Sequence, residues 1–327
     1  MANLMLTEYC NLRCSYCFAR EKIKRQMKEV SLKNVLKYIT FLKESNIDEC
    51  CFCGGEPTLH SRFAQIVKLS LESNMGIALF TNGTWSPQVT GTLAKIPRTK
   101  LGILLNVNRP SYYNRHIWRI LNNNLDFLKD YYEGQDGLRL SLNIFEKDFE
   151  YEYILDLAKR YNVKVIRFAT CVPIFGGENK FIHFEDRKNF GSSIIEFVRA
   201  AKEANIFTRP DCGLVPCTFT SEQIAELIEN NNLSEEENVD SFRRICVPVI
   251  DIGTDLMVWR CFPTSGIIKI HLSYFNNFQE IRQYFDKVYE NCLSIFPSQE
   301  CYLCNWAITK QCRGGCLAHT INKELST

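Results

Sequence analysis

The sequence predicts an α/β fold, a partial (β/α)6 barrel followed by a small cysteine-rich domain. Short apolar runs alternate with helical patterns along the first part of the chain, and together they make six strand–helix units. Such alternation favours a parallel sheet covered by helices. Six units are fewer than the eight of a closed barrel, so we expect a partial barrel. After residue 205 the alternation ends and cysteines become frequent, so we expect one domain over residues 1–205 and another over residues 206–327.

Each expected strand is a short apolar or alternating run, and several end at glycine or asparagine turns. The six strands are expected at Ala2–Thr7, Glu49–Cys53, Gly76–Thr81, Leu101–Val107, Leu138–Ile144 and Val163–Ala169. The helices between them repeat apolar residues at intervals of three and four. They are expected to start at Ser31 and near Phe63, and to cover Ile117–Tyr131, Tyr151–Tyr161 and Glu185–Ala204. Active-site groups should then lie on loops at the carboxyl ends of the strands.

The chain beyond residue 205 is less regular. We expect a short helix near Ser221–Glu229, then a solvated loop or linker at the polar, acidic stretch Asn230–Asn238, for which an acidic partner-binding site is the alternative. Val247–Ile252 and Leu256–Arg260 are expected to form a hairpin. The last third has little periodic pattern and many cysteines, which is typical of a small domain folded around metal.

The composition excludes several classes of protein. Lys and Arg number 39 against 37 for Asp and Glu, so the formal net charge of +2 gives no footprint for nucleic acid or an anionic membrane. No apolar run is long enough to span a membrane, and the first residues do not resemble a secretion signal. We therefore expect a cytoplasmic protein with reduced thiols. Sixteen cysteines in such a compartment more often bind metal or do chemistry than form disulfides, although single cysteines can simply be packed.

The most informative cysteines follow the first expected strand, at the spacing Cys10-x3-Cys14-x2-Cys17. Three thiolates on one loop can hold three irons of a cubane cluster. Iron–sulfur clusters usually take four cysteine ligands, so a loop with three leaves one iron open. A zinc site would also need a fourth ligand, commonly histidine, and the first histidine in the chain is His60.

This motif resembles the signature of the radical S-adenosylmethionine (radical SAM) superfamily, and both Tyr16 before the third cysteine and the six-unit barrel fit the resemblance. It implies that the open iron is chelated by the amino and carboxylate groups of S-adenosylmethionine. An electron from an outside reductant, of flavodoxin or ferredoxin type, would cleave the cofactor to a 5′-deoxyadenosyl radical that takes hydrogen from a C–H bond. The chain would then be a radical SAM oxidoreductase or maturase.

Further residues are expected to bind the cofactor. Two glycines in Gly54-Gly55-Glu56-Pro57 let the backbone approach a ligand closely, and Glu56 offers a carboxylate to an ammonium group. The resemblance implies that this string binds the amino group of S-adenosylmethionine; a plain turn is the alternative. Polar residues in or at the ends of later strands are cofactor or substrate candidates, with a solvent-facing strand end as the alternative for each: Thr81, Asn82, Asn106, Asn108, Asn143 and Arg167.

The C-terminal cysteines form a second group. Four of them follow the spacing C-x2-C-x7-C-x3-C and two precede them; the six are Cys246, Cys261, Cys301, Cys304, Cys312 and Cys316. This group resembles the auxiliary-cluster domain called SPASM, or its shorter relative called twitch. The spacing of the last four also permits a zinc ribbon.

The resemblance implies one or two auxiliary [4Fe–4S] clusters. The first would use Cys246, Cys261 and Cys316, completed by Cys212 or Cys217. The second would use Cys301, Cys304 and Cys312, with Cys292, His319, water or substrate in the fourth place. Three features depart from the family pattern: Leu256 stands where a glycine is usual, the middle gap has seven residues rather than five, and no cysteine follows Cys316 in the sequence.

The remaining cysteines have other expected roles. Cys50, Cys51 and Cys53 lie in or beside an expected buried strand, so they are expected to be packed. Cys171 follows the sixth expected strand, and a thiol there can donate a hydrogen atom to a product radical; a packed thiol is the alternative.

Members with a SPASM domain mostly modify peptides or proteins, so the resemblance favours a peptide or protein substrate. The first expected strand begins at about Ala2, which leaves no room for an N-terminal leader-binding domain; such a peptide would be recognised directly or through a separate partner. Radical dehydrogenation or rearrangement of a small molecule is the second hypothesis. A non-catalytic scaffold that binds iron–sulfur clusters or zinc is the third.

Overall fold

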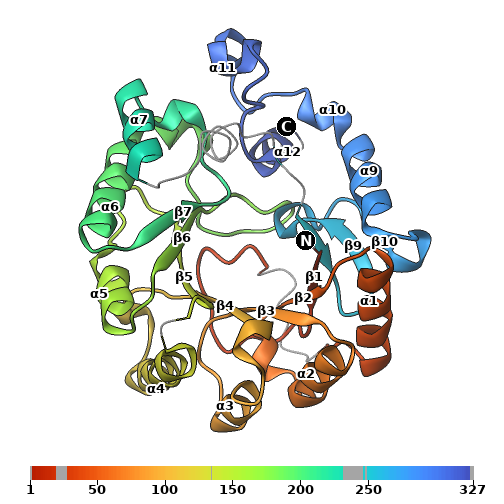
Figure 1. Ribbon diagram of the computed structural model, residues 1–327. Helices are drawn as coiled ribbons and strands as arrows, with labels where there is room; N and C mark the ends of the chain where they lie inside the picture. Colours follow the sequence, from red (N-terminus) through yellow and green to blue (C-terminus); the bar gives the residue numbers. More distant parts are fainter. Residues whose placement is uncertain (1, 20–27, 134, 231–245, 247–248, 325–327) are drawn as a thin grey trace. The chain divides into compact units, whose positions relative to one another are not determined.

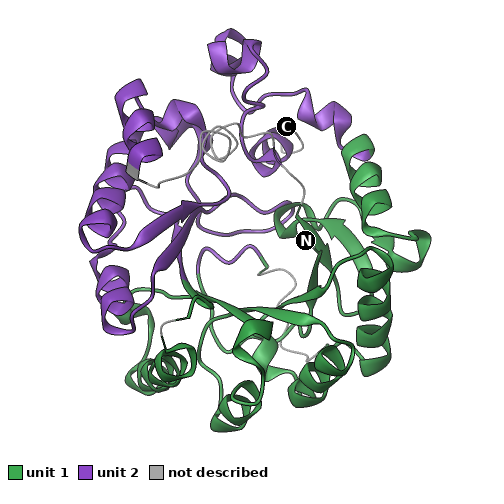
Figure 2. Cartoon of the chain, in the orientation of Figure 1, with its two compact units in different colours: residues 1–14, 19–139, 248–287 green, residues 15–18, 140–247, 288–327 purple. Residues whose placement is uncertain are grey.

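The computed structural model describes residues 2–19, 28–133, 135–230, 246 and 249–324. Contacts divide the chain into two units, coloured separately in Figure 2. Unit 1 comprises residues 1–14, 19–139 and 248–287, and unit 2 comprises residues 15–18, 140–247 and 288–327. The three-cysteine motif is therefore divided, with Cys10 and Cys14 in unit 1 and Cys17 in unit 2.

Unit 1 is built on a mostly parallel sheet. Its first four strands pair in chain order, each parallel to the next: β1 (Ala2–Met5), β2 (Glu49–Cys53), β3 (Gly76–Thr81) and β4 (Leu101–Asn106). On the other side of β1 follow β8 (Ile250–Ile252), which is parallel to β1, and then β9 (Met257–Arg260) and β10 (Ile270–His271), which are antiparallel.

Helices cover one side of the first four strands of unit 1 (Figure 1). They are α1 (Leu32–Glu44), α2 (Phe63–Glu72), α3 (Pro87–Leu93) and α4 (Arg115–Tyr132), and α9 (Phe278–Val288) follows later in the chain. Helix α1 begins where the sequence predicts, because the Ser31 side chain accepts a hydrogen bond from the Asn34 N–H at 3.2 Å. Its apolar residues Val35, Ile39 and Leu42 are buried.

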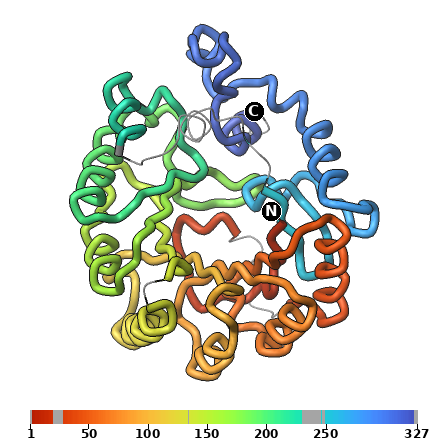
Figure 3. The backbone as a smooth tube through the Cα atoms, in the orientation of Figure 1, coloured from red at the N-terminus to blue at the C-terminus, as the bar shows by residue number. Residues whose placement is uncertain are grey.

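Unit 2 repeats the strand–helix pattern. Strands β5 (Leu138–Ile144, in unit 2 from Leu140), β6 (Val165–Thr170) and β7 (Phe207–Pro210) are parallel. The helices along these strands are traced in Figure 3: α5 (Glu152–Arg160), α6 (Gly191–Glu203) and α7 (Ser221–Asn230). Three short helices come from the end of the chain: α10 (Glu290–Leu293), α11 (Asn305–Ile308) and α12 (Leu317–Glu324).

The six predicted strand–helix repeats are confirmed, with one helix corrected. The predicted helix Glu185–Ala204 is two pieces, a 3₁₀ helix Phe184–Asn189 and then α6. The break falls where a Cβ on Gly191 would lie 2.1 Å from the Thr218 carbonyl oxygen, so a close approach of another segment sets the start of α6. The elements that the sequence did not predict include α3, β7 and α9; β7 has only four residues and ends in Pro210.

The predicted hairpin is present as β8 and β9, although its first residue, Val247, lies outside the described residues. Because β8 pairs with β1, the hairpin belongs to unit 1 and not to a separate C-terminal body. The units thus divide the chain differently from the boundary at residue 205, and a division by function at that point stays a prediction. The expected linker lies outside the described residues except for Asn230, which ends α7. Within the described part of the chain, no helix combines the length and hydropathy that crossing a bilayer requires.

Candidate functional site

In unit 1, the candidate residues follow the carboxyl ends of parallel strands. The segment after β1 lies against the end of β2, where the Gly55 N–H donates to the Thr7 carbonyl at 2.8 Å and the Glu56 N–H to the Tyr9 carbonyl at 2.8 Å. A Cβ on Gly55 would lie 2.1 Å from the Tyr9 oxygen, and one on Gly54, at φ +148°, would lie 2.6 Å from the Thr7 oxygen. The two glycines therefore let the chain that leads to Cys10 pack backbone to backbone; their contact with a ligand stays a prediction.

Glu56 joins the ends of β2 and β3. Its carboxylate is 1% exposed. It accepts hydrogen bonds from the Thr58 N–H and hydroxyl at 3.2 and 2.6 Å, from the Thr81 hydroxyl at 2.7 Å and from the Asn82 N–H at 2.7 Å. Burial raises the pKa of Glu56, and these hydrogen bonds oppose the rise. Pro57 begins the 3₁₀ helix that brings Thr58 to this carboxylate.

Asn82 connects Glu56 to the cysteine motif. Its side-chain N–H donates to Asn11 Oδ1 at 2.9 Å and lies 3.9 Å from Cys10 Sγ. Asn11 in turn donates to the Thr84 hydroxyl at 2.8 Å, and the Leu12 N–H donates to Cys10 Sγ at 3.4 Å. The sequence analysis missed Asn11 and Thr84, although both positions are adjacent to predicted ones, inside the cysteine motif and after the Thr-Asn-Gly turn.

The hydrogen-bond donor to the Cys14 sulfur comes from the segment that follows β4. The Asn108 side chain, 8% exposed, donates to Cys14 Sγ at 3.4 Å, and the Tyr113 hydroxyl accepts from the Asn108 N–H at 2.9 Å. Asn106, the other candidate there, is half-buried at the last position of β4. Nitrogen donors at the sulfurs of Cys10 and Cys14 fit thiolate ligands of a cluster, because hydrogen bonds to ligand sulfur stabilise its negative charge and tune the cluster potential.

The second half of the motif lies in unit 2. The ring of Tyr16, 7% exposed, stacks on Phe145 just after β5, with centroids 4.9 Å apart. The Lys180 N–H donates to the Ser15 carbonyl at 2.9 Å, and the Asn179 side chain donates to the Tyr16 carbonyl at 3.3 Å. The segments after β5 and β6 therefore hold this part of the motif, which includes the half-buried Cys17.

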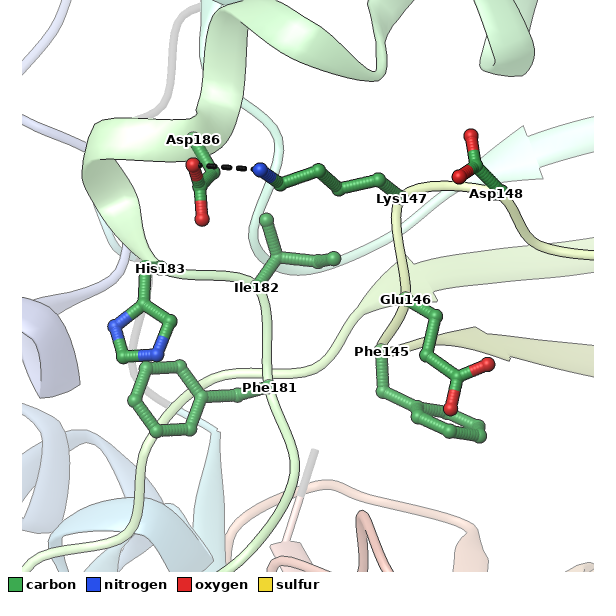
Figure 4. A pocket seen from close by; sticks show the side chains of 8 residues that line it. All are labelled: Phe145, Glu146, Lys147, Asp148, Phe181, Ile182, His183 and Asp186. Carbon is green, nitrogen blue, oxygen red and sulfur yellow. Dashed lines mark ion pairs between the residues drawn. The ribbon is translucent and has the colours of Figure 1, made fainter.

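A pocket of about 420 Å³ opens beside this stack in unit 2 (Figure 4). It lies at the carboxyl ends of β5 and β6, where parallel α/β folds bind their ligands. Its lining residues are Phe145, Glu146, Lys147, Asp148, Phe181, Ile182, His183 and Asp186. Lys147 and Asp186 form an ion pair at 2.8 Å, and Glu146 pairs with Lys180 at 3.2 Å. The lining combines aromatic rings with three carboxylates and one ammonium group.

Three other predicted residues also lie in unit 2. Cys171 follows β6, as predicted; its N–H donates to the Ile144 carbonyl at 2.7 Å, and it is not among the residues that line the pocket. Arg167 in β6 forms an ion pair with Asp211, which follows β7. Asn143 is half-buried in β5. The roles predicted for these three residues stay predictions.

Three of the candidate metal ligands come together in unit 2. Cys301 and Cys312 are buried in one cluster with Phe184 and Val215, and Cys217 packs against it. Burial raises the pKa of the Cys301 thiol to about 11, an increase that the neighbouring Arg187 opposes and Cys217 strengthens. Burial also raises the pKa of the Cys312 thiol, which senses both Cys217 and Cys304.

The remaining candidate ligands are placed separately. Cys261 follows β9 in unit 1 at φ +46°, whereas Cys246 and Cys316 belong to unit 2, so their grouping as ligands stays a prediction. Cys212 is exposed after β7. Among the described residues, no three histidine, cysteine or acidic side chains converge as ligands of a single ion would. The thiolates of a cubane cluster are held further apart, because iron and sulfide lie between them.

The cysteines of β2 are packed, as predicted. Cys50, Cys51 and Cys53 are 0%, 2% and 7% exposed. Burial raises the pKa of Cys50 and of Cys51 to about 12, which is typical of unreactive thiols.

Comparison with known proteins gives one family and several partial relatives. A family model described as Radical SAM superfamily matches residues 4–230. Molybdenum cofactor biosynthesis protein moc-5 of Caenorhabditis elegans is 26% identical over 205 residues, which cover 57% of this chain and 32% of that protein. A GTP 3′,8-cyclase of Clostridium acetobutylicum is 25% identical over 199 residues, which cover 57% of this chain and 60% of that protein. The matches thus span less than two thirds of these relatives.

Solved structures of one protein, SuiB, match almost the whole chain. Streptococcus suis SuiB, in a crystal structure with its precursor peptide SuiA, has a TM-score of 0.65 and 16% identity over 98% of this chain and 72% of that chain. At this identity the likeness shows the fold, and the predicted α/β partial barrel is confirmed. The cysteine-rich region from Cys301 to Cys316 fits a SPASM-like domain.

Proposed function

The chain belongs to the radical SAM superfamily, and we propose that it is an enzyme that abstracts hydrogen from a C–H bond of a peptide or protein. The family implies S-adenosylmethionine and a [4Fe–4S] cluster. The observation that carries the choice of substrate is the aromatic and acidic pocket beside Tyr16 in unit 2.

The cysteine motif supplies the cluster ligands, which are Cys10, Cys14 and Cys17. When bound, the cluster and S-adenosylmethionine supply reductive cleavage of a sulfonium and removal of hydrogen from an unreactive C–H bond. The electron comes from a flavodoxin- or ferredoxin-type partner. The Gly54–Pro57 turn, Thr81 and Asn82 bind the cofactor together with Tyr16, and further polar contacts come from Asn106, Asn143 and Arg167.

The chain's own residues position and tune this site. Asn108 donates to Cys14 Sγ and the Leu12 N–H donates to Cys10 Sγ, and both stabilise negative charge on these sulfurs. Glu56 fixes the turn that carries Asn82, because its buried carboxylate accepts the Asn82 N–H. Cys171, after β6, is the candidate donor of a hydrogen atom to a product radical.

The pocket favours a peptide over a nucleotide. The lining carries carboxylates on Glu146, Asp148 and Asp186. Lys147 pairs with Asp186 and Lys180 pairs with Glu146, so this surface offers no excess of positive charge to a triphosphate. The rings of Phe145 and Phe181 offer apolar area to a side chain, and about 420 Å³ is ample for one or two residues of a peptide. SuiB, whose fold this chain shares, was crystallised with a peptide, which agrees with this choice.

A small-molecule substrate is the second candidate, because the curated relatives include GTP cyclases and nucleotide dehydratases. These two matches are 25% and 35% identical and cover 57% and 25% of this chain, so they support the superfamily more than a particular substrate. A scaffold without catalysis is the third candidate, and product formation separates it from both enzymes.

The test is S-adenosylmethionine cleavage by the anaerobically reconstituted chain with dithionite. We expect 5′-deoxyadenosine, formed faster when short peptides with basic and aromatic residues are added, and no acceleration by GTP. Faster formation with GTP alone would favour the small-molecule enzyme. If a chain with intact clusters forms no 5′-deoxyadenosine, the result favours the third candidate, the non-catalytic scaffold.

Matched variants locate the activity. Cys14→Ala should abolish 5′-deoxyadenosine formation and leave the C-terminal iron in place. Phe181→Ala should leave unstimulated cleavage unchanged and remove the acceleration by peptides. If Phe181→Ala responds to peptides like the wild type, the pocket is not the substrate site.

A further inference from the structure

Three segments of unit 2 bring cysteine sulfurs to one place beside a buried cation. Cys217 lies in the 3₁₀ helix Pro216–Thr218, Cys301 in the 3₁₀ helix Gln299–Leu303, and Cys312 in the turn before α12. The cluster that contains Cys301 and Cys312 also packs against Cys217. Cys304 follows directly, with its N–H 3.2 Å from the Cys301 carbonyl oxygen that accepts it.

The buried cation is Arg187, whose side chain is 7% exposed. Its Nε–H donates to Cys217 Sγ at 3.1 Å, its Nη1 donates to the Phe184 carbonyl at 2.8 Å, and its Nη2 donates to Glu300 at 2.7 Å. A neutral thiol is a weak acceptor, so it offsets little of the cost of burying a guanidinium group. A metal-bound thiolate carries negative charge and makes a charge-assisted hydrogen bond there.

A second sulfur in the same place also receives a nitrogen donor. The Gly314 N–H donates to Cys312 Sγ at 3.3 Å from a turn in which Gly314 and Gly315 have φ +80° and +78°. A Cβ on Gly315 would lie 2.4 Å from Val215, so this glycine lets the turn approach the segment that carries Cys217. Phe184 and Phe296 supply an apolar wall. Sulfurs with nitrogen donors inside an apolar wall are what a protein cluster site requires.

We propose that these segments hold one auxiliary [4Fe–4S] cluster, with Arg187 as a positioning residue at one of its sulfurs; the four ligands are Cys217, Cys301, Cys304 and Cys312. The assignment moves Cys217 away from the set of Cys246, Cys261 and Cys316, which the SPASM spacing allowed it to complete. This assignment of the four ligands does not depend on the substrate. Its test by iron content is also independent of S-adenosylmethionine cleavage.

The iron content of the full, anaerobically reconstituted chain tests whether Cys217 is a ligand of this cluster. Cys217→Ala should lose about four irons per chain, the content of one such cluster, with its absorbance, while Cys292→Ala keeps all of them. Cys292 is the matched control because it is half-buried, belongs to unit 2 and is the other cysteine that could take the fourth place beside Cys301, Cys304 and Cys312. Full iron in Cys217→Ala, an equal loss in Cys292→Ala, or zinc in place of iron would overturn the assignment.

Two further measurements separate ligation from folding. Reconstitution of Cys217→Ala with 2-mercaptoethanol should restore iron, because a small thiol can occupy the vacated place; if the loss came only from misfolding, the thiol would restore none. Arg187→Met should keep the iron and make the reduction potential of this cluster more negative, and Arg187→Lys should recover part of the shift. An unchanged potential in Arg187→Met would contradict the role given to the guanidinium group.

Discussion

Unit 1 and unit 2 each place cysteine sulfurs beside nitrogen donors, but with different donors and different access. In unit 1, half-buried Cys10 and Cys14 lie beside neutral groups, namely backbone N–H and the amides of Asn82 and Asn108. In unit 2, Cys301 and Cys312 are 7% and 8% exposed, Cys217 and Cys304 are half-buried, and a guanidinium group donates to Cys217. We call these the amide site and the guanidinium site.

The difference indicates different roles. An iron that must bind a cofactor needs an accessible position, which suits the half-buried Cys10 and Cys14 better than the buried Cys301 and Cys312. A cluster that only stores an electron or supports the fold can be closed, and a fixed positive charge then stabilises its reduced form. The amide site thus suits cofactor chemistry, and the guanidinium site suits electron storage or structure.

The largest expected effect comes from the glycine that positions the amide site. In Gly55→Ala the new Cβ would meet the Tyr9 carbonyl at 2.1 Å, and backbone cannot rotate away as a side chain can. We expect a stability loss of about 3 kcal/mol. We also expect 5′-deoxyadenosine formation to fall about 100-fold, because the loop that carries Cys10 is displaced. Urea unfolding and the cleavage assay measure the two effects.

Gly315→Ala in the guanidinium site is the matched control. Its Cβ would meet only the Val215 side chain, at 2.4 Å, and its φ of +78° costs a non-glycine residue about 1–2 kcal/mol. The loss should be smaller than for Gly55→Ala, with S-adenosylmethionine cleavage retained. Equal stability losses for the two substitutions would contradict the expectation that a clash with the backbone costs more than a clash with a side chain.

A buried carboxyl group should make the stability of unit 1 depend on pH. Unit 1 buries Asp251 beside Asn3, whose side chain donates to it at 2.8 Å, and burial raises the pKa of Asp251 from 3.8 to about 7. The folded state therefore holds a proton that the unfolded chain releases, and stability falls as the pH rises from about 4 to 7. Asp251→Asn should reduce the stability loss between pH 5 and pH 8 by up to about 3 kcal/mol in urea unfolding.

The control for this pH effect is Asp211→Asn in unit 2. The side chains of Asp211 and its partner Arg167 are 31% and 35% exposed. This substitution should change the pH dependence much less than Asp251→Asn. An unchanged pH profile in Asp251→Asn would mean that water reaches the buried carboxyl.

A smaller effect is expected at the buried glutamate of the amide site. Glu56→Gln replaces one acceptor oxygen by an NH2 group that faces a donor, so at least one hydrogen bond is lost. The free energy of unfolding should fall by about 1–3 kcal/mol. Glu300→Gln, at the exposed carboxylate beside Arg187, should cost less. A larger loss for Glu300→Gln would contradict the expectation that the buried carboxylate contributes more to stability than the exposed one.

The smallest effect is a shift of potential. Asn108→Ala removes the donor at Cys14 Sγ, so the N-terminal cluster should become harder to reduce, while any C-terminal cluster keeps its potential. Redox titration followed by electron paramagnetic resonance measures both. Asn122→Ala, on the outer helix α4, is the control and should shift neither. A shift of the C-terminal signal in Asn108→Ala would contradict the separation of the two sites.

Several particular features could be read from the sequence because they depend on neighbours in the chain. Ser31 caps α1, and Glu49–Cys53 forms β2, as predicted. Leu256 stands at φ +63°, in the backbone region that favours glycine, which explains why glycine is usual at this position in the family pattern. The departure from glycine is tolerated because the Leu256 side chain is 1% exposed, and its burial offsets the strain.

Other features depended on segments far apart in the chain. The glycines of Gly54–Gly55 were expected to admit a ligand, and in unit 1 they admit the backbone before Cys10. Asn11 and Arg187 attracted no prediction, because a polar residue gains a role only when folding gives it a partner. The pairing of β8 with β1, nearly 250 residues apart in the chain, could likewise not be predicted from the local sequence pattern.

By itself, the sequence determined the α/β class, the strand–helix order and the cysteine motif with its family, since periodicity and short spacings are local properties. Only the tertiary structure decided which donor faces each sulfur and which cysteine joins Cys301 and Cys312. Those outcomes depend on the packing of segments such as Phe184–Asn189 and Pro216–Thr218, whose local patterns are too short to specify a partner.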